Sequence, residues 1–158
     1  MSNKKMSFVR ERLKQSKFDS LSHEAVLSIL LASNKIKEMH NAACEKNAIS
    51  YQHFNILRIL KGVYPNGHPR CEISARMMDR SPDITRLISK LVKKKLVVRS
   101  KSTDDMRQSV AIITQKGINL LEEINSEYQL IGQQLETVLG EDDLKKIISI
   151  CDRILTAE

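Results

Sequence analysis

Residues 81–117 read SPDITRLISKLVKKKLVVRSKSTDDMRQSVAIITQKG, a pattern that predicts a helix followed by two strands and the start of another helix. Ser81 is a favoured helix N-cap, and Pro82 stands at the first helical position, where proline is favoured. Two short apolar runs, at 96–98 and 110–113, are typical of strands. Before them, apolar residues recur at helical spacing and predict one buried helix face: Ile84, Leu87, Ile88, Leu91 and Val92.

The opposite face of this predicted helix carries hydrogen-bonding side chains: Asp83, Thr85, Arg86, Ser89, Lys90 and Lys93. The polar loop between the strands, from Lys101 to Gln108, holds Asp104, Asp105 and Arg107. A helix of donors beside a basic hairpin suits duplex DNA, because the helix fits the major groove and the hairpin contacts the backbone or the minor groove. The alternative interpretation is that these polar side chains merely face solvent. The neighbouring hairpin favours contact with DNA instead.

The positive charge of the chain is segregated. The formal net charge is +7, yet residues 70–107 hold 11 Lys and Arg against 5 Asp and Glu, and residues 1–18 hold 6 against 1. The rest of the chain is mildly acidic. Basic residues that served solubility alone would not need this segregation, whereas a footprint for phosphates would.

Several classes of protein are disfavoured by what the sequence lacks. The 158 residues contain no apolar run of membrane-spanning length and no signal peptide, so we expect a cytoplasmic protein. The three cysteines lie far apart without a CxxC pair, which argues against a disulfide framework or a zinc site. No catalytic constellation or phosphate-binding glycine loop is present. We therefore expect neither an enzyme nor a cofactor nor a metal.

Apolar faces on the flanking segments predict a helical domain that pairs with a second copy. Ser22 is a candidate cap for a long helix to about Asn47, and its part 25–32 is apolar nearly all round. A surface helix needs one apolar stripe, so this helix needs cover on two sides, which a partner subunit can supply.

The other end of the chain shows the same character. Thr114 is the candidate cap of a long helix, and Gly140 breaks it. Its seam resembles a coiled coil, with Leu120, Ile124, Tyr128, Ile131, Leu135 and Val138. The helix beyond the break has one apolar stripe: Leu144, Ile147, Ile148, Cys151, Ile154 and Leu155.

Two short helices complete the centre of the chain. One begins at Ser50, and the other, at 72–79, turns Ile73, Met77 and Met78 toward the core. We therefore predict a mainly α (α+β) fold, a winged helix-turn-helix with a two-stranded wing between long terminal dimerisation helices. The predicted parts are a basic arm at 1–20, a DNA-binding domain at 49–117, and a dimerisation domain from 21–48 and 118–158.

Four ordered motifs resemble the MarR family (multiple antibiotic resistance regulators) of winged helix-turn-helix transcription factors. They are SPDITRL at 81–87, LVVR at 96–99, DMR at 105–107 and ITQKG at 113–117. The resemblance implies a homodimer that binds a pseudo-palindromic operator in double-stranded DNA and is often released by a small ligand or by oxidation. One position departs from the family, which usually has glycine where this chain has Lys95. A left-handed backbone there would cost on the order of 1 kcal/mol with lysine.

The predicted DNA contacts combine the helix and the wing. Asp105 is expected to shape the wing, by pairing with Arg107. Arg99 has two open roles, as a structural partner of the wing acids or as a phosphate ligand. The full predicted set is Ser81, Asp83, Thr85, Arg86, Ser89, Lys90, Lys93, Arg99, Lys101 and Arg107.

Cysteines and histidines give secondary candidates. Cys71 follows Arg70 at a helix start, which suits a reactive thiol, although a plain surface or core cysteine is the simpler interpretation. Cys44 and Cys151 lie on apolar stripes and are predicted to be core. His40 and His53 fall where this family tends to bind effectors, and each is also compatible with an ordinary hydrogen bond.

The expected function is a homodimeric, ligand-responsive or redox-responsive transcription regulator, most often a repressor in this family. Winged helices also dock proteins without DNA, and this is the alternative from another class. The basic face favours DNA, because a docking surface would be more apolar at its centre. A thiol-based sensor that uses Cys71 is a further alternative.

Overall fold

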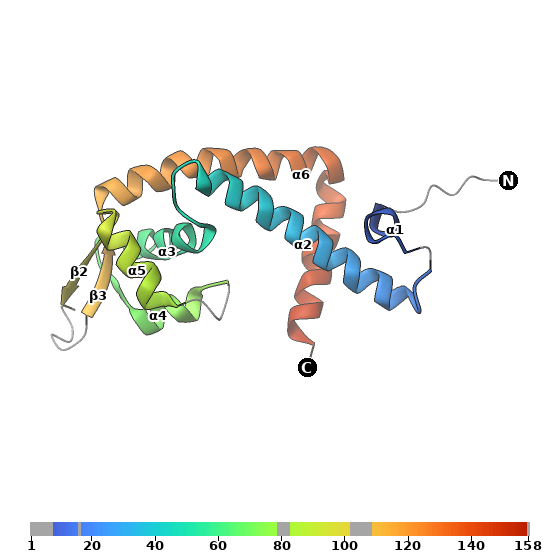
Figure 1. Cartoon of the computed structure of the whole chain (residues 1–158), viewed down its shortest axis with the longest axis horizontal. Coiled ribbons are helices and arrows are strands. Elements are labelled where there is room, and N and C mark those ends of the chain that lie inside the picture. The colour runs from blue at the N-terminus through green and yellow to red at the C-terminus, as the bar shows by residue number, and fades with distance from the viewer. Residues whose placement is uncertain (1–7, 16, 79–82, 102–108, 158) are drawn as a thin grey trace. The chain divides into compact units, whose positions relative to one another are not determined.

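The computed structural model describes residues 8–15, 17–78, 83–101 and 109–157 (Figure 1). It is mostly helical with one small antiparallel sheet, which confirms the predicted fold class. The chain divides into two compact units, 1–42 and 43–158. The elements in chain order are α1 Phe8–Leu13, α2 Leu21–Glu45, α3 Tyr51–Lys61, β1 His68–Pro69, α4 Arg70–Arg76, α5 Ile84–Lys93, β2 Val97–Lys101, β3 Ser109–Ile113 and α6 Gln115–Thr156.

The first unit consists of α1 and most of α2. The Arg10 guanidinium donates to both carboxylate oxygens of Glu24, at 2.9 and 2.6 Å, and this pair ties α1 to the start of α2. Ser20 Oγ accepts the backbone N–H of His23 at 3.1 Å, so Ser20 caps α2 and the predicted cap at Ser22 is wrong. Within α2, Leu30 is 54% exposed, and cover of this helix by a partner stays a prediction.

The second unit is built on a three-stranded sheet in the order β1-β3-β2. β2 and β3 form the predicted hairpin, with Val97 opposite Ile113 and Lys101 opposite Ser109. β1 was not predicted, because its two residues show no alternation of their own. It forms through pairing with a distant strand, with His68 opposite Ala111.

Three helices pack on this sheet. Ser50 caps α3, as predicted. α4 spans Arg70–Arg76, so the predicted bounds 72–79 are wrong: the chain enters the helix directly from β1. Ile73 and Met77 are buried as expected, whereas Met78 is 71% exposed and does not face the core. The largest fully buried side chains include Phe54, Leu57, Leu60, Ile73, Leu91, Ile113 and Ile124.

The start of α5 differs from the prediction. Asp83 is the N-cap, and its carboxylate accepts the backbone N–H of Arg86 at 3.1 Å. The predicted cap at Ser81 is therefore wrong, since α5 begins at Ile84. Ser81 and Pro82 themselves lie outside the described residues. Both candidates are favoured capping residues.

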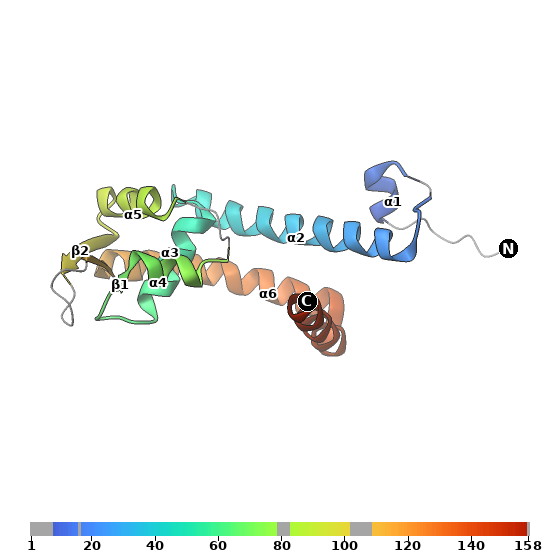
Figure 2. The same ribbon diagram turned by 90° about the horizontal axis from the view of Figure 1, so that it is seen from below.

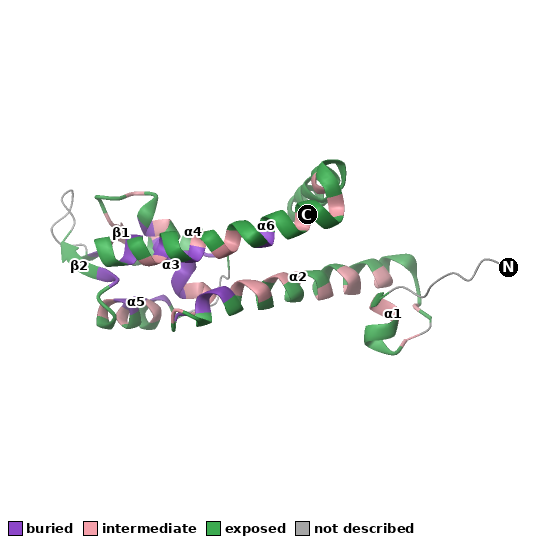
Figure 3. Ribbon diagram, turned by 90° about the horizontal axis from the view of Figure 1, so that it is seen from above, coloured by how far each residue is buried: buried purple, intermediate pink, exposed green. Residues whose placement is uncertain are grey.

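α6 begins after its predicted cap Thr114 and is divided at Gly140, whose φ of 73° and ψ of 166° are not helical. Figures 1 and 2 show the change of direction there. Beyond it the apolar stripe is uncovered, with Ile148 62% and Leu155 82% exposed. Cys151 is exposed too, so its predicted place in the core is wrong for the single chain: among the described residues its neighbours on this stripe are exposed as well. Figure 3 shows buried residues gathered around α3 and the sheet, with α6 exposed toward its end. In the described part of the chain, no helix combines the length and the apolar character that crossing a membrane requires.

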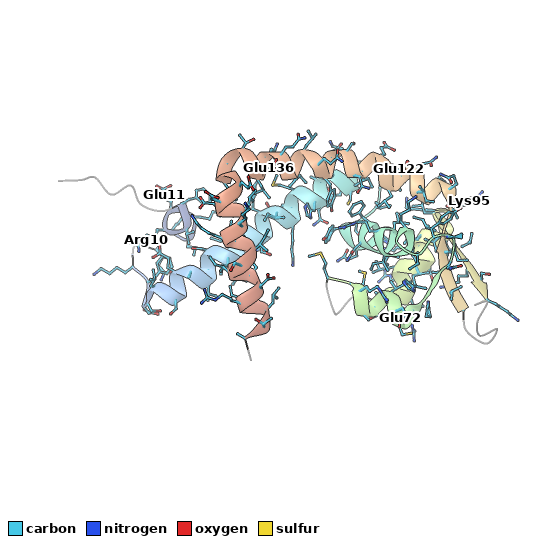
Figure 4. The ribbon with its side chains drawn as sticks, turned by 180° about the vertical axis from the view of Figure 1, so that it is seen from behind. Arg10, Glu11, Glu72, Lys95, Glu122 and Glu136 are labelled. Atoms are coloured by element: carbon cyan, nitrogen blue, oxygen red, sulfur yellow. The ribbon has the colours of Figure 1, made fainter. Side chains whose placement is uncertain are left out.

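α5, β2 and α6 meet at a closely packed junction in the second unit. Lys95, labelled in Figure 4, has a left-handed φ of 61°. It therefore stands in the backbone conformation that the family's usual glycine at this position would adopt more easily. Its carbonyl accepts the Thr114 hydroxyl at 2.9 Å, and the Leu96 carbonyl accepts the Thr114 N–H at 3.0 Å. Gly117 lies against the same Leu96 carbonyl, and a Cβ there would also stand 2.8 Å from Ile113 Cγ1.

We predict that Gly117→Ala destabilises the protein by roughly 1–3 kcal/mol, because backbone atoms cannot yield to the added methyl group. Gly132→Ala is the matched control. It also adds a methyl group to α6, with no atom within 4 Å, and should stabilise the helix by about 0.5–1 kcal/mol. Urea unfolding of both variants measures the difference, and equal stabilities would contradict the packing described here.

Candidate nucleic-acid interface

α5 has one buried and one exposed face. Ile84, Ile88 and Leu91 are at most 6% exposed and anchor the helix in the core. On the other side, the exposed residues are Thr85, Arg86, Lys90 and Lys93, with Ser89 half-buried. Of the predicted set, these residues share one surface of the helix, and Asp83 holds the end of that surface through its bond to the Arg86 N–H.

Two arginines from outside α5 hold its hydroxyl groups. Arg99 in β2 donates from Nη2 to Ser89 Oγ at 2.9 Å, and Ser89 Oγ donates to the Thr85 carbonyl at 2.8 Å. Arg70, the first residue of α4, donates from Nη1 to Thr85 Oγ1 at 3.1 Å. The structure thus gives Arg99 a partner on α5. The wing acids weighed against this role, Asp104 and Asp105, lie outside the described residues.

Sequence analysis did not single out Arg70. The signal available was its membership of the basic segment 70–107, but only the pairing of β1 with β3 brings its side chain to α5. The two arginines and Thr85 line a hollow of about 290 Å³, together with Ser109 of β3. The arrangement puts two guanidinium groups beside the exposed face of α5.

The wing is described only in part. Lys101, at the end of β2, is exposed. Arg107, with Asp105 and the rest of the loop at 102–108, lies outside the described residues, so the predicted contacts of the wing tip stay predictions.

A second basic feature surrounds His53. Its Nδ1 accepts the Ser50 N–H at 3.2 Å, which completes a capping box in which histidine takes the usual place of Glu or Gln. This bond assigns the proton of the neutral ring to Nε2. Nε2 is buried without a hydrogen-bond partner, and the side chain is 8% exposed.

The surroundings of His53 disfavour its charged form. Burial comes first, then the positive charges of Lys90 and Lys94, and together they lower the pKa of His53 below its ordinary value. These groups line a cavity of about 490 Å³ with Ile49, Ser50 and Lys93. None of the lining residues is acidic. The cavity is therefore lined by several hydrogen-bond donors and by no carboxylate that could balance the positive charge of its lysines.

The remaining candidates are placed as follows. Cys71 is exposed in the first turn of α4, and a redox role for it stays a prediction. Cys44 is fully buried, as predicted, and burial raises the pKa of its thiol to about 11. His40 is half-buried in α2, in the other unit from His53. Among the described residues, no group of three or more His, Cys, Asp or Glu side chains could hold a metal ion.

Comparisons with known proteins agree with this geometry. No family model matches the chain. The chain is 27% identical over 123 residues to the HTH-type transcriptional regulator MhqR of Bacillus subtilis (strain 168), covering 78% of this chain and 83% of that protein. A MarR transcription factor from Planctomyces limnophilus is 29% identical, with a TM-score of 0.65 over 86% of this chain and 98% of the other.

More distant structures share the fold. A MepR–DNA complex from S. aureus is 21% identical, with a TM-score of 0.73 over 89% of this chain and 98% of the other. CouR from Rhodococcus jostii RHA1, bound to p-coumaroyl-CoA, is 16% identical, with a TM-score of 0.74 over the same shares. Fold and sequence likeness define the class of this chain, a winged helix-turn-helix DNA-binding regulator of transcription. The resemblance to the MarR family that the motifs predicted is confirmed: the chain is similar in sequence and in fold to MarR-type regulators.

We predict that the stability of the protein depends on pH through His53. Because the folded state lowers the pKa of this ring, the unfolded chain binds the proton more readily, and stability falls as pH drops below about 6.5 toward the lowered pKa. His53→Gln should remove this contribution and keep the capping box. Melting temperatures at pH 8 and pH 5.5 test this prediction. An equally large fall in melting temperature between pH 8 and pH 5.5 in the unmodified protein and in His53→Gln would contradict the prediction.

Proposed function

We propose that the protein is a homodimeric repressor that binds a pseudo-palindromic operator through α5 and the wing. The observation that carries the proposal is the exposed donor face of α5, with Arg86 and Lys90, set beside the β2–β3 hairpin. The MepR structure of the same fold contains DNA. In this proposal, 49–117 forms the DNA-binding domain, 21–48 and 118–158 the dimerisation domain, and 1–20 a basic arm. The protein acts in the cytoplasm and is not an enzyme.

The dimer is proposed from uncovered apolar side chains. On α6 they include Ile148 and Ile154, and on α2 they include Val26 and Leu30, all exposed by half or more. Apolar stripes of this kind mark surfaces that bind protein. A two-fold dimer carries two copies of α5 and reads two half-sites about 34 Å apart, which accounts for an operator with inverted symmetry.

We predict that Ile148→Asp converts the dimer to a monomer or to insoluble protein, because the charge would be buried without a partner. Ser149→Asp, the adjacent exposed position on α6, is the control and should remain dimeric. Analytical ultracentrifugation measures both. A folded, stable monomer of the unmodified chain at micromolar concentration would refute the proposed dimer even if the variant precipitates.

We predict that Arg86 and Lys93 contribute differently to DNA binding. Arg86→Ala should cost about 1–3 kcal/mol and relax the preference at one base pair. Lys93→Ala should weaken all sequences about equally and reduce the salt slope by about one, as loss of a phosphate contact does. Lys145→Ala, an exposed lysine of α6 paired with Glu141, is the control for lost charge. DNA affinities measured over a series of salt concentrations test both expectations. Unchanged DNA binding by both α5 variants would show that the exposed face of α5 is not the DNA-binding surface.

The same salt series separates DNA binding from the protein-docking alternative. Binding of DNA weakens steeply with salt because counterions are released, and docking of a protein weakens much less. The basic face of α5 supports the DNA interpretation.

We also propose that a small anionic effector binds in the cavity beside His53 and weakens DNA binding. Support comes from the unpartnered Nε2–H donor and from three lysines without an acid in the lining. Lys90 and Lys93 belong both to this cavity and to the predicted DNA face. A ligand that binds these lysines therefore competes with the phosphates of DNA. It can also change the spacing between the two α5 helices of the dimer. His40 stays a candidate for the same role.

Linkage provides the test of the effector. If a ligand weakens DNA binding, DNA must weaken the ligand by the same factor. Benzoate can serve as the probe, with benzamide as its uncharged match, and each affinity is measured with and without operator DNA. Equal affinities in both conditions would exclude benzoate as an effector, however tightly it binds.

A further inference from the structure

The hollow of about 290 Å³ beside α5 is lined by two arginines that come from different elements. Arg70 reaches it from the start of α4, and Arg99 reaches it from β2. Thr85 of α5 and Ser109 of β3 add hydroxyl groups to the lining. The other described lining residues are apolar, and none is acidic. The polar side chains around the hollow are therefore two cations and two alcohols.

Neither arginine has a carboxylate partner in the part of the chain that the structure describes. The ion pairs found there join other residues, and the pair on α4 joins Arg76 to Glu72 at the opposite end of that helix. Two guanidinium groups on one hollow repel each other, and an anion bound between them offsets this repulsion. The hollow is thus a cationic site whose charge no described side chain balances.

Hydroxyl groups of α5 hold both guanidinium groups in place. Arg70 Nη1 donates to Thr85 Oγ1 at 3.1 Å, and Arg99 Nη2 donates to Ser89 Oγ at 2.9 Å. Ser89 Oγ donates in turn to the Thr85 carbonyl at 2.8 Å, which fixes the hydroxyl that receives Arg99. A guanidinium has more N–H donors than the one that each of these bonds uses, so donors remain for a ligand. Side chains that are already held lose less entropy when the ligand binds.

The sheet explains why two arginines so far apart in sequence meet at one hollow. Ala111 in β3 stands opposite Arg99 of β2 on one side and opposite His68 of β1 on the other. Arg70 follows β1 directly and opens α4, whose Ile73 is fully buried. Ala111 itself lines the hollow and contributes only a methyl group. The backbones of both arginines are therefore fixed by the fold.

The place of the hollow indicates which anion it binds. In the proposed complex, α5 lies in the major groove, and the β2–β3 hairpin beside it reaches the adjacent minor groove (Figure 1). A sugar-phosphate backbone separates these two grooves, so a protein that occupies both straddles one backbone strand. Residues of α5 and of the hairpin line the hollow together. In that complex the hollow faces the backbone between the grooves.

We infer that Arg70 and Arg99 form a clamp on a single backbone phosphate in each half-site, with the hydroxyls of Thr85 and Ser89 as positioning groups. The inference rests on the proposed DNA binding through α5 and the wing. Two arginines suit this role, because the guanidinium fork matches the oxygens of a phosphate. A phosphate contact of this kind carries no sequence information, but it fixes the register of α5 on the duplex. Arg70 and Arg99 thereby determine which base pairs α5 meets.

The experiment replaces the phosphates of an operator one at a time with neutral methylphosphonates. The operator is first selected from random duplexes with the unmodified protein. One substitution in each half-site, on the strand between the two occupied grooves, should weaken binding roughly tenfold to a hundredfold, the effect of losing charge-assisted hydrogen bonds. Arg70→Met and Arg99→Met should each weaken binding to the intact operator. Each should also lose its sensitivity to that one substitution and keep its sensitivity to the others.

Three further variants serve as controls. Arg76→Met removes an arginine of the same helix that is already paired with Glu72, and it should keep the full pattern of sensitivity. Arg99→Lys keeps the charge without the fork and should retain part of the sensitivity. Ser89→Ala leaves both charges in place and should reduce the sensitivity at the clamped phosphate alone, because Arg99 loses the hydroxyl that holds it. Circular dichroism checks that each variant is folded.

Three outcomes would overturn the inference and leave the DNA-binding function in place. Coupling of the two arginines to different phosphates would make them separate contacts. Full sensitivity at every position in both Met variants would show that the hollow binds no phosphate of the operator. The third outcome is that same full sensitivity together with binding of inorganic phosphate to the free protein that both Met variants lose, measured by calorimetry at constant ionic strength. It would assign the hollow to a small phosphorylated ligand.

Failure of the unmodified protein to bind any duplex is a different result. It would refute the proposed DNA-binding function, and the clamp with it.

Discussion

The Leu96 carbonyl is the atom on which the second unit depends most. It accepts the Thr114 N–H, and Gly117 packs directly on it, so β2, the end of β3 and the first turn of α6 meet at one peptide group. Lys95 immediately before it adopts a left-handed conformation so that the chain can turn from α5 into β2. The orientation of α5 relative to the sheet and to α6 therefore follows from this junction.

Much of this unit could be predicted from the sequence because the signals are local. The apolar period in α5, the strand runs and the caps Ser50 and Thr114 each concern a few consecutive residues. Gly140 also acts locally, since its positive φ interrupts α6 although a Cβ there would meet no atom within 4 Å. Local patterns of this kind survive folding because the core agrees with them.

The missed features depend on residues far apart in the chain. β1 exists because His68 meets Ala111, and the role of Arg70 follows from that pairing. Cys151 lies on an apolar stripe whose periodicity suggested burial, but the stripe is exposed in the described part of the chain. The cap of α5 was missed for a different reason. Ser81 and Asp83 are both good capping residues two positions apart, and propensity does not choose between them.

The cap that does form has a consequence for how the protein moves among DNA sequences. An open helix N-terminus attracts any phosphate through its free N–H groups, whatever the bases nearby. In α5 the Asp83 carboxylate already takes one of these groups and adds a negative charge at the tip. In the proposed complex with DNA, affinity must then come from side chains further along the helix, which would meet base edges as well as phosphates. If α5 binds DNA as proposed, this cap reduces binding to bulk chromosomal DNA, and more of a small cellular pool remains free to find its target.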